Sequence, residues 1–151
     1  MINGNLKRID LLPHGKAMTY TSIKELNTTL LCCALGIVKA INELIMELGG
    51  TTLPLAEAEV MCERVIAGDS DGAIVVAKDG DQLVGVCTVS FQDAIRTLGK
   101  YAIIQEMYVA PEHRNGGLGA QLVDAAAEEA VNRECKIVEL GTSPDAERFY
   151  E

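Results

Sequence analysis

The stretch from Tyr101 to Ala120, YAIIQEMYVAPEHRNGGLGA, decides the fold of this chain. Its first half is rich in β-branched and aromatic residues and closes with Ala110 and Pro111, which predicts a strand that ends at Val109. After the glycines, apolar residues recur at helical spacing. The stretch therefore predicts a strand that passes through a glycine-rich turn into a helix.

Such a turn suits an anion. The first amides of a helix have no partner inside it and carry the positive end of the helix dipole. Glycines at Gly116, Gly117 and Gly119 leave room for a diphosphate, and Arg114 adds a positive charge. The spacing lacks the third glycine of a dinucleotide fingerprint and the lysine of a P-loop.

Arg114, Gly117 and Gly119 form an R-x-x-G-x-G pattern that resembles the signature of the GNAT superfamily of N-acetyltransferases. The resemblance extends through the preceding MYVAPEHR and through AERFY near the end, roughly from Ala73 to Glu151. It implies an α/β fold with a mixed, mostly antiparallel sheet flanked by helices. It also implies that the loop holds the pyrophosphate of acetyl-coenzyme A. A glycine turn that only lets the strand enter the helix is the alternative.

The resemblance also implies which residues contact the coenzyme. In the family, the main chain at the end of the central strand commonly bulges and splays from its neighbour, so that pantetheine can insert. Ser143 stands where many members have an asparagine that contacts pantetheine. The predicted coenzyme-binding residues are Met107, Tyr108, Val109, Arg114, Asn115, Gly116, Gly117, Leu118, Gly119, Ala120 and Ser143.

Two residues are candidates for the acid–base steps. An alkyl ammonium has a pKa of about 10.4, so a base must remove its proton before attack at neutral pH. Glu106 has apolar or neutral strand neighbours, which favours a carboxylate that points into a cleft, and family members often use a glutamate in this strand. Tyr150 matches the family's tyrosine beside the coenzyme sulfur, which implies an acid for the departing thiolate. The alternatives are a solvent-facing glutamate and a tyrosine that only packs.

The length and charge of the chain limit its class. The 151 residues fit a single domain over residues 1–151, in which residues 1–20 have no assigned role. The formal net charge of -9 argues against nucleic acid or an anionic membrane as partner. An acidic surface suits a cationic substrate, although many proteins are acidic only for solubility.

The five cysteines are odd in number and fall in apolar segments without C-x-x-C spacing. They predict buried thiols in a reducing compartment, with no metal site. The longest apolar run, from Leu30 to Val38, is too short to span a bilayer. Because the first residues also lack the pattern of a signal peptide, we expect a cytoplasmic protein.

The remaining elements follow from apolar periodicity and from turn residues. In the first half we expect a strand at Leu6 to Leu12, a helix from Ser22 to Leu48 that Gly49 and Gly50 stop, and a helix from Pro54 to Ala67. Two helices with a bend near Gly36 are the alternative to the single long helix. In the second half we expect strands at Ala73 to Lys78 and Gln82 to Phe91 joined by a D-G turn, a polar loop from Gln92 to Lys100, a helix from Gly117 to Arg133, a strand from Lys136 to Leu140 and a last helix from Pro144 to Glu151. Family members usually continue into two more strands, which we expect to be missing here because the sequence ends at Glu151.

The long first helix carries apolar residues beyond one stripe, including Leu31, Leu35 and Val38. Monomers rarely expose large apolar patches, so this excess predicts a homodimer. A wide helix face packed on the chain's own sheet is the alternative.

Together these patterns predict an acetyl-coenzyme A dependent N-acetyltransferase that acts on a small amine by direct transfer in a ternary complex. The loops between the first helices and the segment from Gln92 to Lys100 would line the acceptor pocket. The residues Gln92, Asp93, Arg96 and Thr97 fit aminoglycosides, polyamines, amino acids or peptide amines. The rival hypothesis is a GNAT-fold protein that binds coenzyme A as a regulator or scaffold without catalysis.

Overall fold

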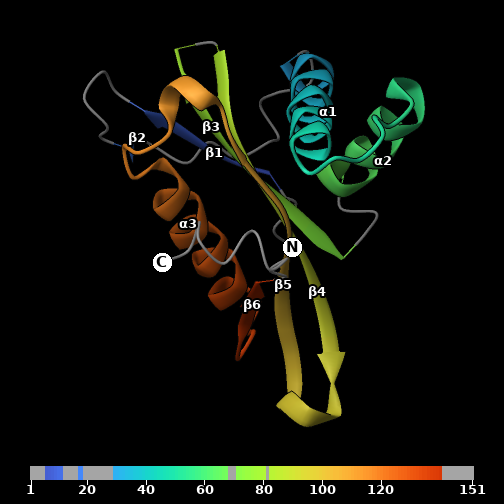
Figure 1. Ribbon diagram of the computed structural model, residues 1–151. Coiled ribbons are helices and arrows are strands. Elements are labelled where there is room, and N and C mark those ends of the chain that lie inside the picture. Colours follow the sequence, from blue (N-terminus) through green and yellow to red (C-terminus); the bar gives the residue numbers. More distant parts are fainter. Residues whose placement is uncertain (1–5, 12–16, 19–28, 68–70, 81, 141–151) are drawn as a thin grey trace.

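The computed structural model describes residues 6–11, 17–18, 29–67, 71–80 and 82–140 (Figure 1). Within these ranges the elements are β1 (Leu6–Leu11), β2 (Ala17–Met18), α1 (Thr29–Glu47), α2 (Leu55–Ala67), β3 (Gly72–Asp79), β4 (Gln82–Ala94), β5 (Gly99–Val109), α3 (Leu118–Asn132) and β6 (Val138–Leu140). Short 3₁₀ turns at Ile95–Thr97 and Pro111–His113 follow β4 and β5.

The described strands form one sheet in the order β2-β1-β3-β4-β5-β6. The pairs β1–β2, β3–β4 and β4–β5 are antiparallel, whereas β1–β3 and β5–β6 are parallel. The expected mixed, mostly antiparallel sheet is confirmed. The D-G turn between β3 and β4 is also present, and Gly80 has a φ of +59°, a conformation that favours glycine.

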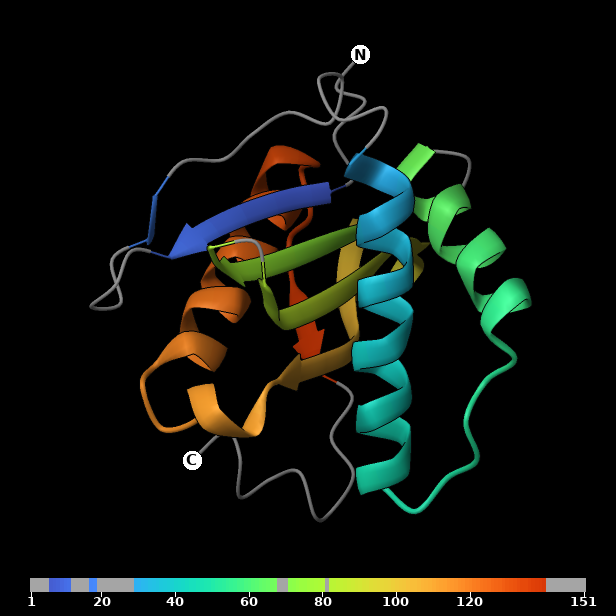
Figure 2. The ribbon, with the colours of Figure 1, turned by 90° about the horizontal axis from the view of Figure 1, so that it is seen from above.

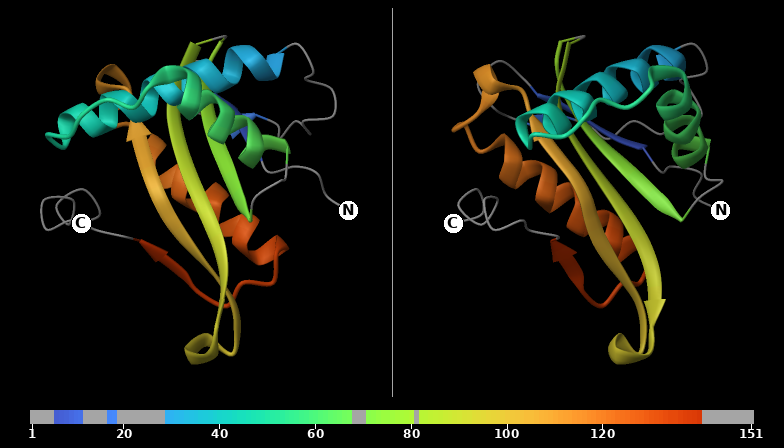
Figure 3. Two further views of the ribbon diagram at one scale, coloured as in Figure 1. Left: turned by 90° about the vertical axis from the view of Figure 1, so that its right-hand side faces the viewer. Right: turned by 45° about the vertical axis from the view of Figure 1, so that its right-hand side comes forward.

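Helices cover both faces of this sheet (Figure 2). The helices α1 and α2 pack on one face, where Ile37, Ile66 and Val76 belong to one buried cluster. The helix α3 packs on the other face (Figure 3). Because β3 lies between these layers, its side chains are buried from Gly72 through Lys78, which explains its nearly continuous apolar sequence.

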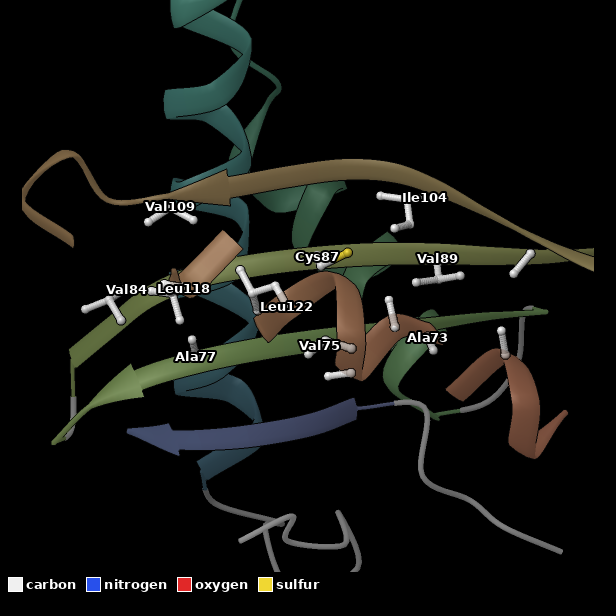
Figure 4. Packing of buried hydrophobic residues seen from close by; sticks show 14 of the residues in the cluster. Ala73, Val75, Ala77, Val84, Cys87, Val89, Ile104, Val109, Leu118 and Leu122 are labelled. Carbon is white, nitrogen blue, oxygen red and sulfur yellow. The ribbon is translucent and has the colours of Figure 1, made fainter. Parts of the chain in front are cut away.

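The core on the α3 side is formed by side chains of β3, β4 and β5 that point toward this helix (Figure 4). Leu118 and Leu122 fill its centre, and Leu122 is completely buried. A Cβ atom at Gly85 would lie 2.9 Å from Leu122 Cδ1, so β4 has a glycine where the helix approaches most closely. This packing fixes the start of α3 against the end of β5.

A bulge interrupts the pairing of β4 with β5. Thr88 pairs with Glu106, but the next residue of β4, Val89, pairs with Ile104, so Gln105 is an extra residue on β5. The bulge reverses the alternation along β5: Ile104 and Met107 both contact the α3-side core. We expected the irregularity at Met107 to Val109, but those residues pair regularly with β4.

The prediction of a polar loop from Gln92 to Lys100 was wrong. The strand β4 continues to Ala94, and the two ends of this segment pair with each other across the hairpin. The hairpin projects beyond the helices (Figure 1). Its turn is closed by Thr97, whose hydroxyl donates to the carbonyls of Ala94 and Gly99 at 3.0 and 2.6 Å. Polar residues are tolerated here because the projecting strands lack a covering helix.

The helix α1 ends as the glycines predicted. Gly49 has a φ of +79°, and the amide of Gly50 donates to the carbonyl of Ile45 at 2.8 Å. The helix runs unbroken through Gly36, so the alternative of two helices is wrong. Val38 is buried on the chain's own sheet. The expected start at Ser22 lies outside the described residues.

Candidate active site

The glycine-rich turn reverses the chain between β5 and α3. Pro111 opens a 3₁₀ turn, and Asn115 and Gly117 then take φ values of 65° and 82°. Asparagine and glycine are the residues that adopt this region most readily. The amide of Ala110 donates to the carbonyl of Val84 at 2.8 Å, which ties the start of the turn to β4.

The N-terminus of α3 is open for an anion. Gly117 is the N-cap residue and makes no side-chain capping hydrogen bond. The first backbone hydrogen bond of the helix is the one that the amide of Gln121 donates to the carbonyl of Gly117 at 3.1 Å. The amides of Leu118, Gly119 and Ala120 therefore have no acceptor within the helix. A Cβ atom at Gly117 would meet nothing within 4 Å. Free space and converging amides at a helix N-terminus fit a phosphate group.

The Arg114 side chain is held in place beside this turn. Its Nε donates to the carbonyl of Val109 at 2.8 Å, and its Nη2 lies 2.7 and 2.9 Å from the two carboxylate oxygens of Glu47 on α1. The guanidinium also lies 5.8 Å from the centre of the Tyr108 ring. The positive charge predicted for the loop is thus present, but Glu47 partly neutralises it.

Glu106 points toward the α1 and α2 side of the sheet, where its carboxylate accepts a hydrogen bond from the Thr88 hydroxyl. The same hydroxyl accepts the backbone amide of Glu106 at 3.1 Å. Burial raises the pKa of Glu106 above that of an ordinary glutamate. In the described part of the chain no Lys or Arg pairs with this carboxylate. A half-buried carboxylate without a cation is suited to accept a proton.

A cavity of about 360 Å³ separates α1 and α2 from the sheet. Glu106 and Gln105 both line it, because the bulge turns two consecutive side chains of β5 to one face. The cavity is lined by Ile37, Val38, Ile41, Leu53, Ala58, Met61, Cys62, Val65, Asp71, Gly72, Ala73, Ile74, Thr88, Val89, Ser90, Gln105 and Glu106. None of the four residues predicted for the acceptor pocket belongs to this lining, since they lie on the projecting hairpin.

The last part of β5 has a partner on one side only among the described residues. The strand β6 pairs with Ala102, Ile103 and Ile104, whereas the segment from Gln105 to Val109 has β4 alone beside it. In the part of the chain that the structure describes, this unpaired edge of β5 runs from Glu106 to the start of the glycine turn. Glu106 precedes Val109 by three residues, which is about 10 Å of extended strand.

Comparison with known proteins assigns the chain to a family. The model of the acetyltransferase (GNAT) family matches residues 38–151, about three quarters of the chain. The chain belongs to the GNAT family. An uncharacterized N-acetyltransferase of Archaeoglobus fulgidus is 35% identical over 89 residues, which are 57% of this chain and 60% of that protein. The match thus spans well under the full length of this relative.

Solved structures share the GNAT fold of this chain. A transcriptional regulator from Bacillus halodurans is 27% identical, with a TM-score of 0.61 and coverage of 82% of this chain and 84% of that one. Glucosamine-6-phosphate N-acetyltransferase from Arabidopsis thaliana is 19% identical, with a TM-score of 0.63 and coverage of 80% and 82%. At the latter identity the likeness concerns the fold alone.

Two residues of this candidate site were missed by the sequence analysis. Thr88 was not distinguished from its strand neighbours, although a threonine opposite a glutamate on paired strands would have indicated a contact. Glu47 is 67 residues from Arg114, and no local pattern links them. Ser143 and Tyr150 lie outside the described residues, so their predicted roles stay predictions.

Within the described ranges the structure shows no group of three or more His, Cys, Asp or Glu side chains that could hold a metal ion. None of the described helices combines the length and the apolar character that crossing a membrane requires.

Proposed function

We propose that this GNAT chain is an acetyl-coenzyme A dependent N-acetyltransferase that acetylates the amine of a small molecule or peptide by direct attack in a ternary complex. One observation carries the proposal. The strand β5 presents to a cavity the carboxylate of Glu106, which has no cation partner among the described residues, and it ends about 10 Å further along at Val109, where the glycine turn leads to the N-terminus of α3. A candidate base and a candidate phosphate site are thus connected by one strand and the turn that follows it.

The chain's residues fit the coenzyme. The amides of Leu118, Gly119 and Ala120 would meet the diphosphate, and Arg114 lies beside the same turn. The β5 edge at Met107 to Val109 would receive the pantetheine arm, with Ser143 as a further contact. Bound there, the coenzyme supplies the acetyl group as a thioester.

Each catalytic role follows from a property of this chain. Glu106 would accept the proton of the substrate ammonium, and the Thr88 hydroxyl would orient its carboxylate. Tyr150 would donate a proton to the thiolate, because a phenol with a pKa of about 10 stays protonated at neutral pH.

Burial, and then the charge of Glu106, raise the pKa of Cys87 to about 12. That thiol is unsuited to carry the acetyl group, which favours direct attack.

Turnover with a panel of amines tests the proposal. The protein is incubated with acetyl-coenzyme A and single amines, and the acetylated amine is detected by mass spectrometry, since the protein's own five cysteines would disturb a thiol assay. We expect acetylation of at least one amine and its loss in Glu106→Gln at neutral pH. Coenzyme binding without acetylation of any amine would reject catalysis.

A second candidate is a GNAT protein that binds coenzyme A as a regulator or scaffold. The similarity to a protein described as a transcriptional regulator is the observation in its favour. This candidate predicts that coenzyme A raises the melting temperature while no amine is consumed. The same panel therefore separates the two.

We also propose a reducing, cytoplasmic environment and a homodimer, with neither nucleic acid nor membrane as partner. Cys62 and Cys87 are buried and form no disulfide within the described ranges, and the net charge of -9 disfavours polyanions. Large apolar side chains at the end of α1, directly after it and on α2, including Met46, Leu48 and Val60, are exposed in the single chain.

A further inference from the structure

We propose that the acceptor is an amine with a single positive charge on an apolar body, and that this body occupies the cavity between α1, α2 and the sheet. The inference rests on the proposed acetyltransferase function and narrows its substrate class. It follows from how apolar and charged side chains are distributed around the cavity.

The walls that α1 and α2 contribute are apolar. Eight residues of these helices and of the segment between them line the cavity, and none carries a charge or a hydrogen-bonding group stronger than a thiol: Ile37, Val38, Ile41, Leu53, Ala58, Met61, Cys62 and Val65. The binding of a ligand group against these walls is favoured only by the removal of apolar surface from water.

The polar groups of the cavity come from the sheet and already have partners. Gln105 Nε2 donates to Ser90 Oγ at 2.8 Å, and the Thr88 hydroxyl is engaged with Glu106. They leave few sites for the many hydroxyl and amino groups of an aminoglycoside. A ligand with one polar end therefore fits better than one with polar groups throughout.

Two carboxylates line the cavity, and they differ in charge balance. Asp71 Oδ2 lies 3.8 Å from Lys100 Nζ, and Asp71 Oδ1 lies 3.7 Å from Arg133 Nη1, so two cations offset its charge. Glu106 has no cation partner among the described residues. One ammonium can therefore be neutralised at Glu106, whereas a second ammonium on the same molecule would lie against apolar walls, where an unpaired charge is very unfavourable.

The cavity volume limits the size of the apolar body. Its 360 Å³ corresponds to about twelve water molecules at liquid density. An aromatic ring on a short linker or an unbranched alkyl chain fits this space. Polyamines and aminoglycosides, which the sequence left open, do not match its charge distribution.

Hexylamine and 1,6-diaminohexane form the decisive pair, because they share one chain and differ by the second ammonium. With saturating acetyl-coenzyme A, we expect kcat/KM to rise roughly tenfold or more from butylamine to hexylamine, since each buried methylene contributes about fourfold. We expect 1,6-diaminohexane to be at least about tenfold poorer than hexylamine. A diamine or spermidine that is used as well as hexylamine would overturn the inference while leaving acetyl transfer intact.

Two variants of α2 test where the body binds. Ala58→Leu adds bulk to a side chain that lines the cavity, whereas Ala56→Leu makes the same change at an exposed position outside it. The advantage of hexylamine over butylamine should shrink in Ala58→Leu and persist in Ala56→Leu, with unchanged coenzyme affinity in both. Equal chain-length dependence in both variants would place the body elsewhere and refute the inference.

Calorimetric titration of hexylamine into the protein with coenzyme A separates this inference from the function on which it rests. Binding that Ala58→Leu weakens, without any acetylated product, would support the cavity assignment and reject catalysis. Acetylation without a preference for apolar amines would support catalysis and reject the cavity assignment.

Discussion

Replacing Gly117 by Ala tests whether the glycine turn binds the coenzyme. At a φ of 82°, an alanine is destabilised relative to glycine by about 1–2 kcal/mol. A chain of 151 residues loses about 2–4 °C of melting temperature per kcal/mol, so Gly117→Ala should melt roughly 2–8 °C below the parent. The added methyl group meets nothing within 4 Å in the free protein and would occupy the space assigned to the diphosphate.

Gly49→Ala is the matched control. Gly49 has a φ of +79°, and a Cβ atom there also meets nothing within 4 Å, so the backbone cost should be the same. Gly49 follows α1 and is not part of the turn. Any difference in coenzyme binding between the two variants then reports on the position and not on strain.

Differential scanning fluorimetry with and without coenzyme A gives the result. At a hundredfold excess over the dissociation constant, the coenzyme stabilises a binding-competent protein by about 2.7 kcal/mol, or roughly 5–11 °C. The parent and Gly49→Ala should show this rise, and Gly117→Ala should lose most of it. An equal rise in both variants would refute the phosphate-turn assignment.

Five further outcomes are expected. Glu106→Gln should lower kcat/KM at neutral pH by about 10²-fold to 10⁴-fold and recover at high pH, where the amine loses its proton unaided; a profile like that of the parent would exclude Glu106 as base. Because burial raises the folded-state pKa of Glu106, its ionisation costs stability as pH rises through that pKa, so Glu106→Gln should melt higher than the parent at pH 7 but not below the pKa of an unfolded glutamate. Glu47→Gln should tighten coenzyme binding roughly two- to fivefold by freeing Arg114, as suits a partly exposed pair, and an unchanged calorimetric affinity would mean that Arg114 does not reach the phosphates. Tyr150→Phe should cut the maximal rate without changing coenzyme affinity; an unchanged rate would leave Tyr150 as a packing residue. Light scattering at micromolar concentration should give a dimer mass, and a monomer across that range would contradict the dimer.

The local parts of the fold could be predicted because their causes are local. The strand that ends at Val109, the turn at Gly80 and the stop of α1 at Gly49 each depend on residues within a few positions. The prediction of α2 as Pro54 to Ala67 agrees with the observed Leu55–Ala67 for the same reason.

The parts that failed depend on distant residues. Gln105 and Glu106 are both polar, so their sequence does not show which of them interrupts the alternation, and the register becomes fixed only by pairing with Thr88. The Arg114–Glu47 pair depends on how α1 crosses the sheet. The apolar cavity likewise forms only when α1 and α2 pack over β3, β4 and β5.

The bulge at Gln105 also bears on how this site could change during evolution. The bulge sends two consecutive side chains, Gln105 and Glu106, to the cavity side, while Ile104 and Met107 stay on the α3 side. Loss of the codon for Gln105 would therefore restore regular alternation and leave Glu106 facing the cavity. Loss of the codon for Met107 would instead exchange the sides of the residues between Glu106 and the glycine turn. We therefore expect related proteins to differ in the length of this strand at residue 105 more readily than between Glu106 and Val109.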